Sequence, residues 1–267
     1  MPISGNNSSE PLFAEERKKE IIRLLKKNEK VVVPKLCEYF NVSPATIRND
    51  LRELERAGHL KRTHGGAIDI SKVGFELNTE EKKVQNLSSK QSIAKKALEF
   101  IEDGDIIILD TGTTTLELAK LLRDFRDLTV VVNDIDIARH LEEIDGVNII
   151  LIGGTVRKNF HCTVGPLASK ILTDLNVDKV FLATNGFTVE KGCTTPDVSQ
   201  AEIKEIMVNI ASEVIVLCDS SKIGKSTFTQ FAPTSAIDVL ITDGKLDKKM
   251  LTELSGQEFD LILSDPS

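Results

Sequence analysis

The stretch FNVSPATIRNDLRELERAGHLKRTHGGAI, residues 40–68, contains the pattern that decides the fold of the N-terminal part of the chain. Ser43 is a favourable N-cap, and Pro44 suits a first helical position because the N–H that proline lacks has no partner there. The pattern therefore predicts a helix that begins at these residues and ends near residues 57–58. At 100° per residue, three apolar residues form one inward-packing seam on this helix, namely Ile47, Leu51 and Leu54.

The opposite face of the predicted helix carries side chains suited to DNA. Its members are Ala45, Arg48, Asn49, Arg52 and Arg56. In the major groove, arginine pairs with guanine and asparagine pairs with adenine. A basic helix face on its own is more often only a solvated surface, so its context decides between the two interpretations.

The flanking residues supply a context that favours DNA. Apolar residues at helical spacing predict helices over residues 16–27 and 33–40, and the tight turn at residues 41–43 gives the geometry of a helix-turn-helix. Residues 60–63 and 67–68 can pair as two short strands of a wing. We therefore predict a winged helix-turn-helix domain over residues 14–69, called the head below. Its predicted contacts with double-stranded operator DNA are Ser43, Thr46, Arg48, Asn49, Arg52, Arg56, Lys61, Arg62 and His64.

The composition of the 267-residue chain is that of a soluble protein with one small and one medium domain. No apolar run reaches the roughly 18 residues of a membrane helix, and the first dozen residues lack the features of a signal peptide, so we expect a cytoplasmic protein. The four cysteines are scattered without a C-x-x-C pair and the four histidines are dispersed. These patterns predict reduced thiols, no metal site and no catalytic cluster.

The charge is divided unevenly along the chain. Residues 1–68 contain 13 Lys and Arg against 9 Asp and Glu, whereas the other 199 residues contain 21 against 32. An acidic surface is repelled by phosphates, so this division confines the predicted DNA contact to the head.

The rest of the chain alternates between strand and helix patterns. Residues 1–13 are polar and are expected to be disordered, and residues 70–89 lose clear periodicity and are expected to link two domains. From residue 90 to residue 267, short apolar runs such as residues 105–110 alternate with amphipathic helices. This alternation predicts an α/β domain with a doubly wound, mostly parallel sheet.

The loop after the first predicted strand of this domain, DTGTTT at residues 110–115, is a candidate phosphate site. Ligands of open parallel sheets bind at the carboxyl ends of the strands. Gly112 would let the backbone approach a ligand, the Thr hydroxyls can donate, and the next helix presents free N–H groups. Such residues also merely cap helices, so the loop alone is weak evidence. Polar residues at the other predicted strand ends strengthen it, namely Asn133, Gly153, Gly154, Arg157, Asn185, Gly186 and Asp219 to Lys222.

Both regions resemble the DeoR family of bacterial transcriptional regulators. In the head, the pattern L…F-x-V-S-x-x-T-I-R-x-D-L-x-x-L-E-x-x-G-x-L-x-R-x-H-G-G-A is met from Leu36 to Ala67. Asn49 stands where that family commonly has a second arginine, and Cys37 replaces a usual alanine. The matching motifs of the second region are DTGTT at 110–114, GGTVR at 153–157, VGP at 164–166, AEIK at 201–204 and DSSK at 219–222.

The resemblance implies a second domain similar to ribose-5-phosphate isomerase and CoA transferases, with a phosphorylated sugar as effector. No cofactor is implied, and a homodimer or homotetramer is expected. The implied role is repression of carbohydrate-utilisation genes, with the DTGTT loop at the phosphate and Lys222 as a second charge partner. The predicted effector-binding residues are Asp110, Gly112, Thr113, Thr114, Thr115, Asn133, Gly154, Arg157, Asn185, Gly186, Lys204, Asp219 and Lys222.

Two other classes of function compete with a regulator. An isomerase or deaminase would need a positioned acid and base, for which Asp110, Glu202, Asp219 and Lys222 are candidates. A DNA-binding head has no purpose on a metabolic enzyme, and His161 is the only histidine in the predicted rim loops, so we favour a sensor without turnover. A purely structural nucleoid protein would leave the phosphate loop unexplained.

Overall fold

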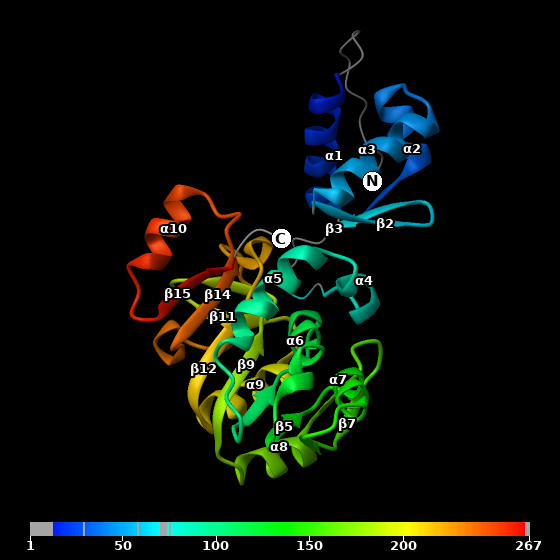
Figure 1. The fold of residues 1–267 in the computed structure, drawn as a ribbon. Coiled ribbons are helices and arrows are strands. Elements are labelled where there is room, and N and C mark those ends of the chain that lie inside the picture. Colours follow the sequence, from blue (N-terminus) through cyan, green and yellow to red (C-terminus); the bar gives the residue numbers. More distant parts are fainter. Residues whose placement is uncertain (1–12, 29, 58, 70–73, 75, 265–267) are drawn as a thin grey trace. The chain divides into compact units, whose positions relative to one another are not determined.

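A computed structural model describes residues 13–28, 30–57, 59–69, 74 and 76–264 (Figure 1). The chain forms two compact units that divide between residues 75 and 76. Each unit is treated by itself. The segment predicted to be disordered, residues 1–13, lies outside the described residues except for Phe13.

The head has the predicted winged helix-turn-helix architecture. Its elements are α1 (Ala14–Asn28), β1 (Lys30–Val32), α2 (Val33–Phe40), α3 (Pro44–Arg56), β2 (Leu60–Thr63) and β3 (Gly66–Asp69). Asn41 ends α2 in the left-handed conformation with φ 51°, and the Ser43 side chain accepts from the Thr46 N–H at 3.2 Å, which caps α3. The sequence did not indicate β1, which pairs antiparallel with β3 and completes a three-stranded wing sheet.

The head is held together by one apolar cluster and one buried ion pair. Ile21 of α1, Leu36 of α2 and Ile47 of α3 are almost fully buried in the cluster. The Arg17 Nε donates to the Asp50 Oδ2 at 2.5 Å, and the two side chains keep only 10% and 5% of their surface exposed. This pair joins α1 to the inner face of α3.

The second unit, called the α/β domain below, is built on a seven-stranded sheet in which every pairing is parallel. Its strand order is β15 (Asp260–Ser264), β14 (Val239–Asp243), β12 (Ala211–Leu217), β9 (Val177–Ala183), β4 (Ile106–Leu109), β5 (Leu128–Val132) and β6 (Val147–Leu151). The order reverses its direction between β4 and β9, so these neighbouring strands form the topological switch point. Ligands of such sheets bind beyond the carboxyl ends of the strands at that point.

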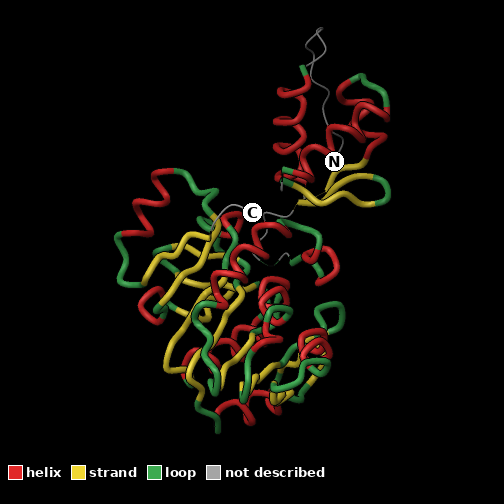
Figure 2. The backbone as a smooth tube through the Cα atoms, in the orientation of Figure 1, coloured by secondary structure: helices red, strands yellow, loops and turns green. Residues whose placement is uncertain are grey.

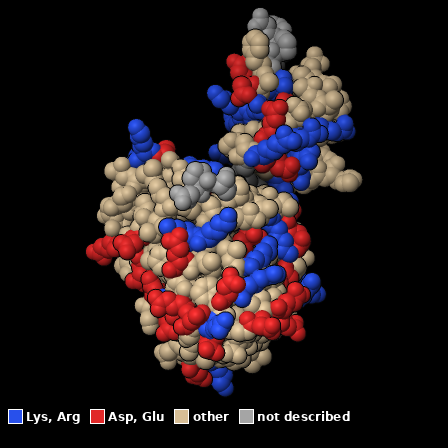
Figure 3. Space-filling view, viewed as in Figure 1, with Lys and Arg blue, Asp and Glu red and all other residues tan. Residues whose placement is uncertain are grey.

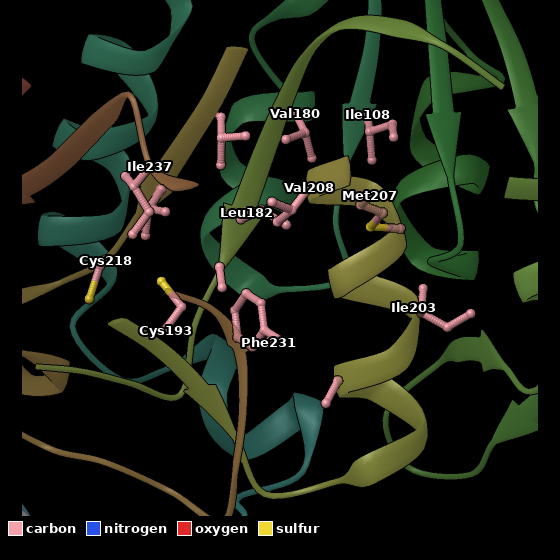
Figure 4. Close-up of a cluster of buried hydrophobic side chains, with 14 of the residues drawn as sticks. Ile108, Val180, Leu182, Cys193, Ile203, Met207, Val208, Cys218, Phe231 and Ile237 are labelled. Carbon is pink, nitrogen blue, oxygen red and sulfur yellow. The ribbon is translucent and has the colours of Figure 1, made fainter. Parts of the chain in front are cut away.

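Helices cover both faces of this sheet, as expected for a doubly wound fold (Figure 2). One face packs against α5 (Leu87–Leu98), α6 (Thr113–Ala119) and α7 (Ile135–Leu141). The other packs against α8 (Pro166–Thr173) and α9 (Val198–Asn209), and Figure 4 shows Met207 and Val208 of α9 beside Val180 and Leu182 of β9. A last helix, α10 (Lys248–Ser255), precedes β15. Within the described residues, no helix has both the length and the apolar character needed to cross a membrane.

Short antiparallel strands beside the main sheet were not predicted. They are β7 (Thr155–Arg157), β8 (Cys162–Val164), β10 (Gly186–Thr188), β11 (Gly192–Thr195) and β13 (Thr229–Ala232). Each has three or four residues, which is too short for an alternating pattern to stand out from a loop.

The predicted connection over residues 70–89 differs from the structure. Residues 70–73 and 75 lie outside the described part, but residues 76–89 belong to the α/β domain. They contain α4 (Thr79–Lys83) and the first residues of α5, which begins at Leu87. Polar contacts, more than apolar burial, hold this segment, so hydrophobic periodicity gave no sign of it.

Candidate functional site

The exposed face of α3 carries the predicted base-reading side chains. Arg48, Asn49, Arg52 and Arg56 are all exposed. The Asn49 Nδ2 donates to the Glu53 Oε1 at 2.9 Å, and the Arg52 Nη1 donates to the Asn49 Oδ1 at 3.3 Å. Asn49 must therefore exchange these contacts to read a base. Figure 3 shows Lys and Arg side chains along the visible face of the head, beside acidic ones.

The wing is fixed to α3 by one of the residues predicted to contact DNA. The Arg62 Nε donates to the Glu55 Oε2 at 2.7 Å, and the Arg62 backbone N–H donates to the Glu55 Oε1 at 2.8 Å. His64 is exposed at the tip of the wing, and Lys61 is partly buried. Arg62 thus positions the wing in this structure, whereas His64 is accessible to a DNA backbone.

The α/β domain has a pocket at its switch point. It holds about 770 Å³ of space, including that at its open mouth. Its walls come from the carboxyl ends of β4, β9 and β12 and from residues 76–90, which we call the strap. The lining residues are Glu76, Thr79, Lys82, Gln85, Asn86, Lys90, Thr111, Gly112, Thr113, Thr114, Asp134, Phe160, Ala183, Thr184, Asn185, Gln200, Lys204, Leu217, Cys218, Asp219 and Lys222.

The loop after β4 contributes to the pocket, but not through every predicted residue. Gly112, Thr113 and Thr114 line it, whereas Thr115 is fully buried and donates its hydroxyl to the Gly112 carbonyl at 2.9 Å. A Cβ at residue 112 would lie 2.6 Å from the Ala183 Cβ. The structure therefore requires glycine here for close packing against the end of β9, a reason the sequence did not reveal.

Four lysines line the pocket, and two of them have carboxylate partners. The Lys204 ammonium contacts the buried Asp110 carboxylate and donates to the Ala183 carbonyl at 2.9 Å. The Lys82 ammonium lies 2.6 Å from the Glu76 Oε1. Within the described residues, Lys90 and Lys222 have no carboxylate partner, and Lys90 donates to the Lys82 carbonyl at 2.5 Å.

The electrostatics of these lysines favour an anion in the pocket. Burial lowers the pKa of Lys82, and the nearby charges of Lys222 and Lys204 lower it further, against the opposing effect of Glu76. Burial also lowers the pKa of Lys90 to about 8, and Lys222 and Lys82 lower it further, against the opposing charge of Asp219. A bound anion would relieve the repulsion between these ammonium groups.

Glu76 is a pocket carboxylate that contacts three other side chains. Its Oε1 accepts from Lys82 at 2.6 Å and from the Asn185 Nδ2 at 3.2 Å, and its Oε2 lies 2.8 Å from the Arg157 Nη1. Burial acts to raise the pKa of Glu76, but the charges of Lys82 and Arg157 outweigh it and the pKa is lowered. Arg157 also stacks on Phe160, with 3.6 Å between the guanidinium carbon and the ring centroid.

The pocket brings together part of the predicted effector set. Gly112, Thr113, Thr114, Asn185, Lys204, Asp219 and Lys222 line it. The others are not among its lining residues, namely Asp110, Thr115, Asn133, Gly154, Arg157 and Gly186. Their contacts explain this placement: Asn133 donates to the Thr163 carbonyl at 2.9 Å, and a Cβ at Gly154 or Gly186 would meet a backbone oxygen at 2.8 or 2.5 Å. Asp110 and Arg157 lie behind the lining and contact lining residues, Lys204 and Glu76 respectively.

Sequence reasoning missed the strap residues Glu76, Lys82 and Asn86 because it assigned them to a linker, and it did not single out Lys90, the first residue of the predicted second domain. One available signal was the capping box at Asn78, which marks the start of α4.

One cluster beside the strap has the spacing of a metal site. Within the described part of the chain, only Glu80, Asp136 and His161 offer three ligand atoms close enough to share an ion. The Lys83 ammonium already lies 2.7 Å from the Glu80 Oε1 and 2.9 Å from the Asp136 Oδ2. Lys83 therefore already supplies a positive charge to these two carboxylates. The absence of a metal site stays a prediction from the sequence.

Two family models match the chain, one on each unit. A model described as a DeoR-like helix-turn-helix domain matches residues 17–73. A model described as the DeoR C terminal sensor domain matches residues 85–244.

Relatives with similar sequences cover nearly the whole chain. The HTH-type transcriptional regulator GlpR of Haloferax volcanii is 40% identical over 90% of this chain and 93% of its own length. The putative aga operon transcriptional repressor of Escherichia coli O157:H7 is 34% identical over 93% of both chains. A solved ribose-5-phosphate isomerase in complex with phospho-erythronic acid overlaps 55% of each chain, at 23% identity and a TM-score of 0.38.

Proposed function

Because this chain belongs to the DeoR family of transcriptional regulators, we propose that it represses carbohydrate-utilisation genes and is controlled by a phosphorylated sugar. The chain is a DNA-binding regulator and not an enzyme, so the alternative of an isomerase or deaminase is set aside. One relative is named as a putative repressor of the aga operon, which supports repression as the direction of control. A regulator acts where its DNA lies, so we place the protein in the cytoplasm.

In this proposal the head recognises an operator through α3 and the wing. Arg48 and Arg52 are exposed on α3 and have the guanidinium geometry that pairs with guanine. His64 at the wing tip suits contacts to phosphates, which position a protein on the duplex without specifying its sequence. Glu55 and Arg62 keep the wing at a fixed place on α3 during this contact.

The observation that carries the choice of ligand is the pair of lysines without carboxylate partners. Lys90 and Lys222 leave two ammonium charges uncompensated by direct contacts in the pocket, within the described residues. A phosphate monoester carries close to two negative charges at neutral pH, and lysine is an established phosphate binder. A carboxylate or a phosphodiester would supply only one charge, so a phosphomonoester is the best match.

The other polar groups of the pocket suit the hydroxyl groups of a sugar. Asn185, Gln200 and Asn86 offer amides that can both donate and accept, and Asp134 offers a carboxylate. Burial raises the pKa of Asp134. A ligand that combines a phosphate with several hydroxyl groups would use both kinds of lining. No cofactor is needed for such binding.

Titration of the full-length protein with a panel of ligands tests this assignment. We expect pentose and hexose phosphates to bind in calorimetry, and the same sugars without phosphate to bind at least tenfold more weakly. The Lys222→Met variant should lose most of this preference, while Lys191→Met, at an exposed lysine that does not line the pocket, should keep it. Equal binding of phosphorylated and free sugars would refute a phosphate site in this pocket.

Control of transcription needs a separate experiment. DNA protected by the protein should be mapped upstream of genes for carbohydrate use, and the ligand identified above should change that protection. If the protected sites lie beside genes of another kind, the role in carbohydrate use is wrong even when the ligand site is correct.

A further inference from the structure

Lysines from two parts of the α/β domain line the pocket. Lys82 and Lys90 belong to the strap, residues 76–90, whereas Lys204 and Lys222 belong to the opposite wall, formed by α9 and the segment after β12. The wall lysines lower the pKa of Lys82, and Lys222 lowers that of Lys90. The ammonium groups of the strap and the wall therefore repel one another, whereas the Asp219 carboxylate of the wall attracts Lys90.

Polar contacts hold the strap against this repulsion. The Lys83 ammonium lies 2.9 Å from the Asp136 Oδ2, and the Asn86 Nδ2 donates to the Asp219 Oδ1 at 2.9 Å. The Thr79 N–H donates to a backbone carbonyl at 3.0 Å. No residue of α4 is buried, whereas α5 that follows is anchored by fully buried residues such as Ile93. Segments with few buried apolar contacts open most easily.

We propose that a phosphomonoester dianion bridges the strap and the wall, and that it closes the strap by turning repulsion between the four lysines into attraction. This step rests on the proposed function, because it requires that the ligand's phosphate occupy the lysine-lined pocket. It goes beyond ligand binding, because it assigns Lys82 and Lys90 to a moving element. It also gives a purpose to a strap that has no buried apolar residue among residues 76–90.

The place of the strap in the chain gives its closure a consequence. Glu76 is the first residue of the α/β domain, and the head precedes it along the chain. The Glu76 side chain contacts Lys82 within the strap and both Arg157 and Asn185 outside it. A ligand that draws on Lys82 therefore acts directly on the residue from which the connection to the head departs.

Hydrogen exchange of the full-length protein tests the closure, with inorganic phosphate as the probe. We expect phosphate to slow the exchange of the amides of residues 79–86 roughly fivefold or more, the lower end of usual coupling between sites. Sulfate, also a tetrahedral dianion, should act in the same direction. Sodium chloride at matched ionic strength should not, because it screens charges without bridging them.

A charge-removing variant on the wall should slow the exchange of the strap amides even in the absence of ligand. In Lys222→Met the repulsion is reduced, so the strap amides should exchange more slowly than in the wild type before phosphate is added. Added phosphate should then slow them less. Lys191→Met is the matched control, because this exposed lysine does not line the pocket, and it should behave as the wild type does.

Binding must be measured beside exchange to separate the two proposals. If dialysis shows that phosphate binds and the strap amides exchange at an unchanged rate, the closure is wrong and the phosphate site stands. If phosphate does not bind at all, both proposals fail. If Lys222→Met and the wild type respond equally, the dianion does not act through the charge of the wall.

Discussion

Arg48 is the residue of α3 best placed to read a base. It is exposed and its side chain makes no hydrogen bond or ion pair with the described residues, in contrast to Asn49 and Arg52, which contact each other. Arg48→Ala should weaken binding to the operator by about 1–3 kcal/mol, the usual value of a bidentate contact with guanine. Binding to random DNA should change little, because non-specific affinity comes from phosphates.

Fluorescence anisotropy at one fixed salt concentration measures both affinities of this variant. Arg123→Ala, which removes an exposed arginine of the α/β domain, is the control and should leave both unchanged. An equal loss on operator and random DNA would make Arg48 a phosphate contact.

Lys90 should make ligand binding depend on pH. Its pKa is lowered to about 8 by burial and by neighbouring lysines, so the protein loses this charge as the pH rises through that value. The second ionisation of a phosphomonoester is complete above about pH 7. The dissociation constant should therefore rise roughly tenfold between about pH 7 and about pH 9, as one hydrogen bond to a charged group is lost. Calorimetry should also show proton uptake on binding near about pH 8, because the ligand stabilises the charged amine.

The conservative variant isolates the group responsible for this profile. Lys90→Arg stays charged over the whole range, so the part of the pH dependence that comes from this residue near about pH 8 should disappear. A flat profile for the wild type would mean that Lys90 does not face the phosphate.

Among the elements, α1 and α3 depend on the buried pair of Arg17 and Asp50. Asp50→Ala would leave the Arg17 guanidinium without this carboxylate in a site where its side chain is only 10% exposed. We expect a loss of about 3 kcal/mol in the free energy of unfolding of the head, the lower end for buried pairs.

Tyr39 is the only tyrosine and the chain has no tryptophan, so tyrosine fluorescence during urea unfolding reports on the head alone. Glu53→Ala, which removes the exposed partner of Lys18, should change stability little, and equal losses would contradict a special role for the buried pair.

The elements also show what the sequence could predict. The helix from Ser43 and the strands of the main sheet were predictable, because capping and long apolar runs are local signals. The pocket was half predictable. Its DTGTT loop and Lys222 follow strand ends, whereas Glu76, Lys82 and Lys90 come from a segment without apolar periodicity. Asp110 and Arg157 were predicted to bind the effector, but they do not line the pocket; the structure pairs them with Lys204 and Glu76, long-range contacts that no local pattern reveals.

For the whole molecule, we expect self-association. A single DNA-binding module of this size buries about 600–1,000 Å² on DNA, and two heads on spaced half-sites are the usual route to operator affinity. The full-length protein should sediment as a dimer or tetramer at micromolar concentration. Its footprint should show two half-sites whose centres are about 34–36 Å apart or a multiple of that distance. A monomer that protects a single half-site would contradict this expectation.

The two domains should be coupled, and release of DNA is the direction we expect for the phosphorylated ligand. A coupling free energy of about 1–3 kcal/mol corresponds to a roughly 5- to 150-fold loss of operator affinity, and linkage requires DNA to weaken ligand binding by the same factor.

Thr113 lines the pocket and is 8% exposed, so Thr113→Glu would place a negative charge beside the phosphate. This variant should bind the operator as the wild type does without ligand and should not respond to ligand. Thr113→Val keeps the size without the charge, and it controls for misfolding at a nearly buried position. A response of Thr113→Glu at the wild-type ligand concentration, or unequal coupling factors measured from the two sides, would show that the signal does not start from this loop.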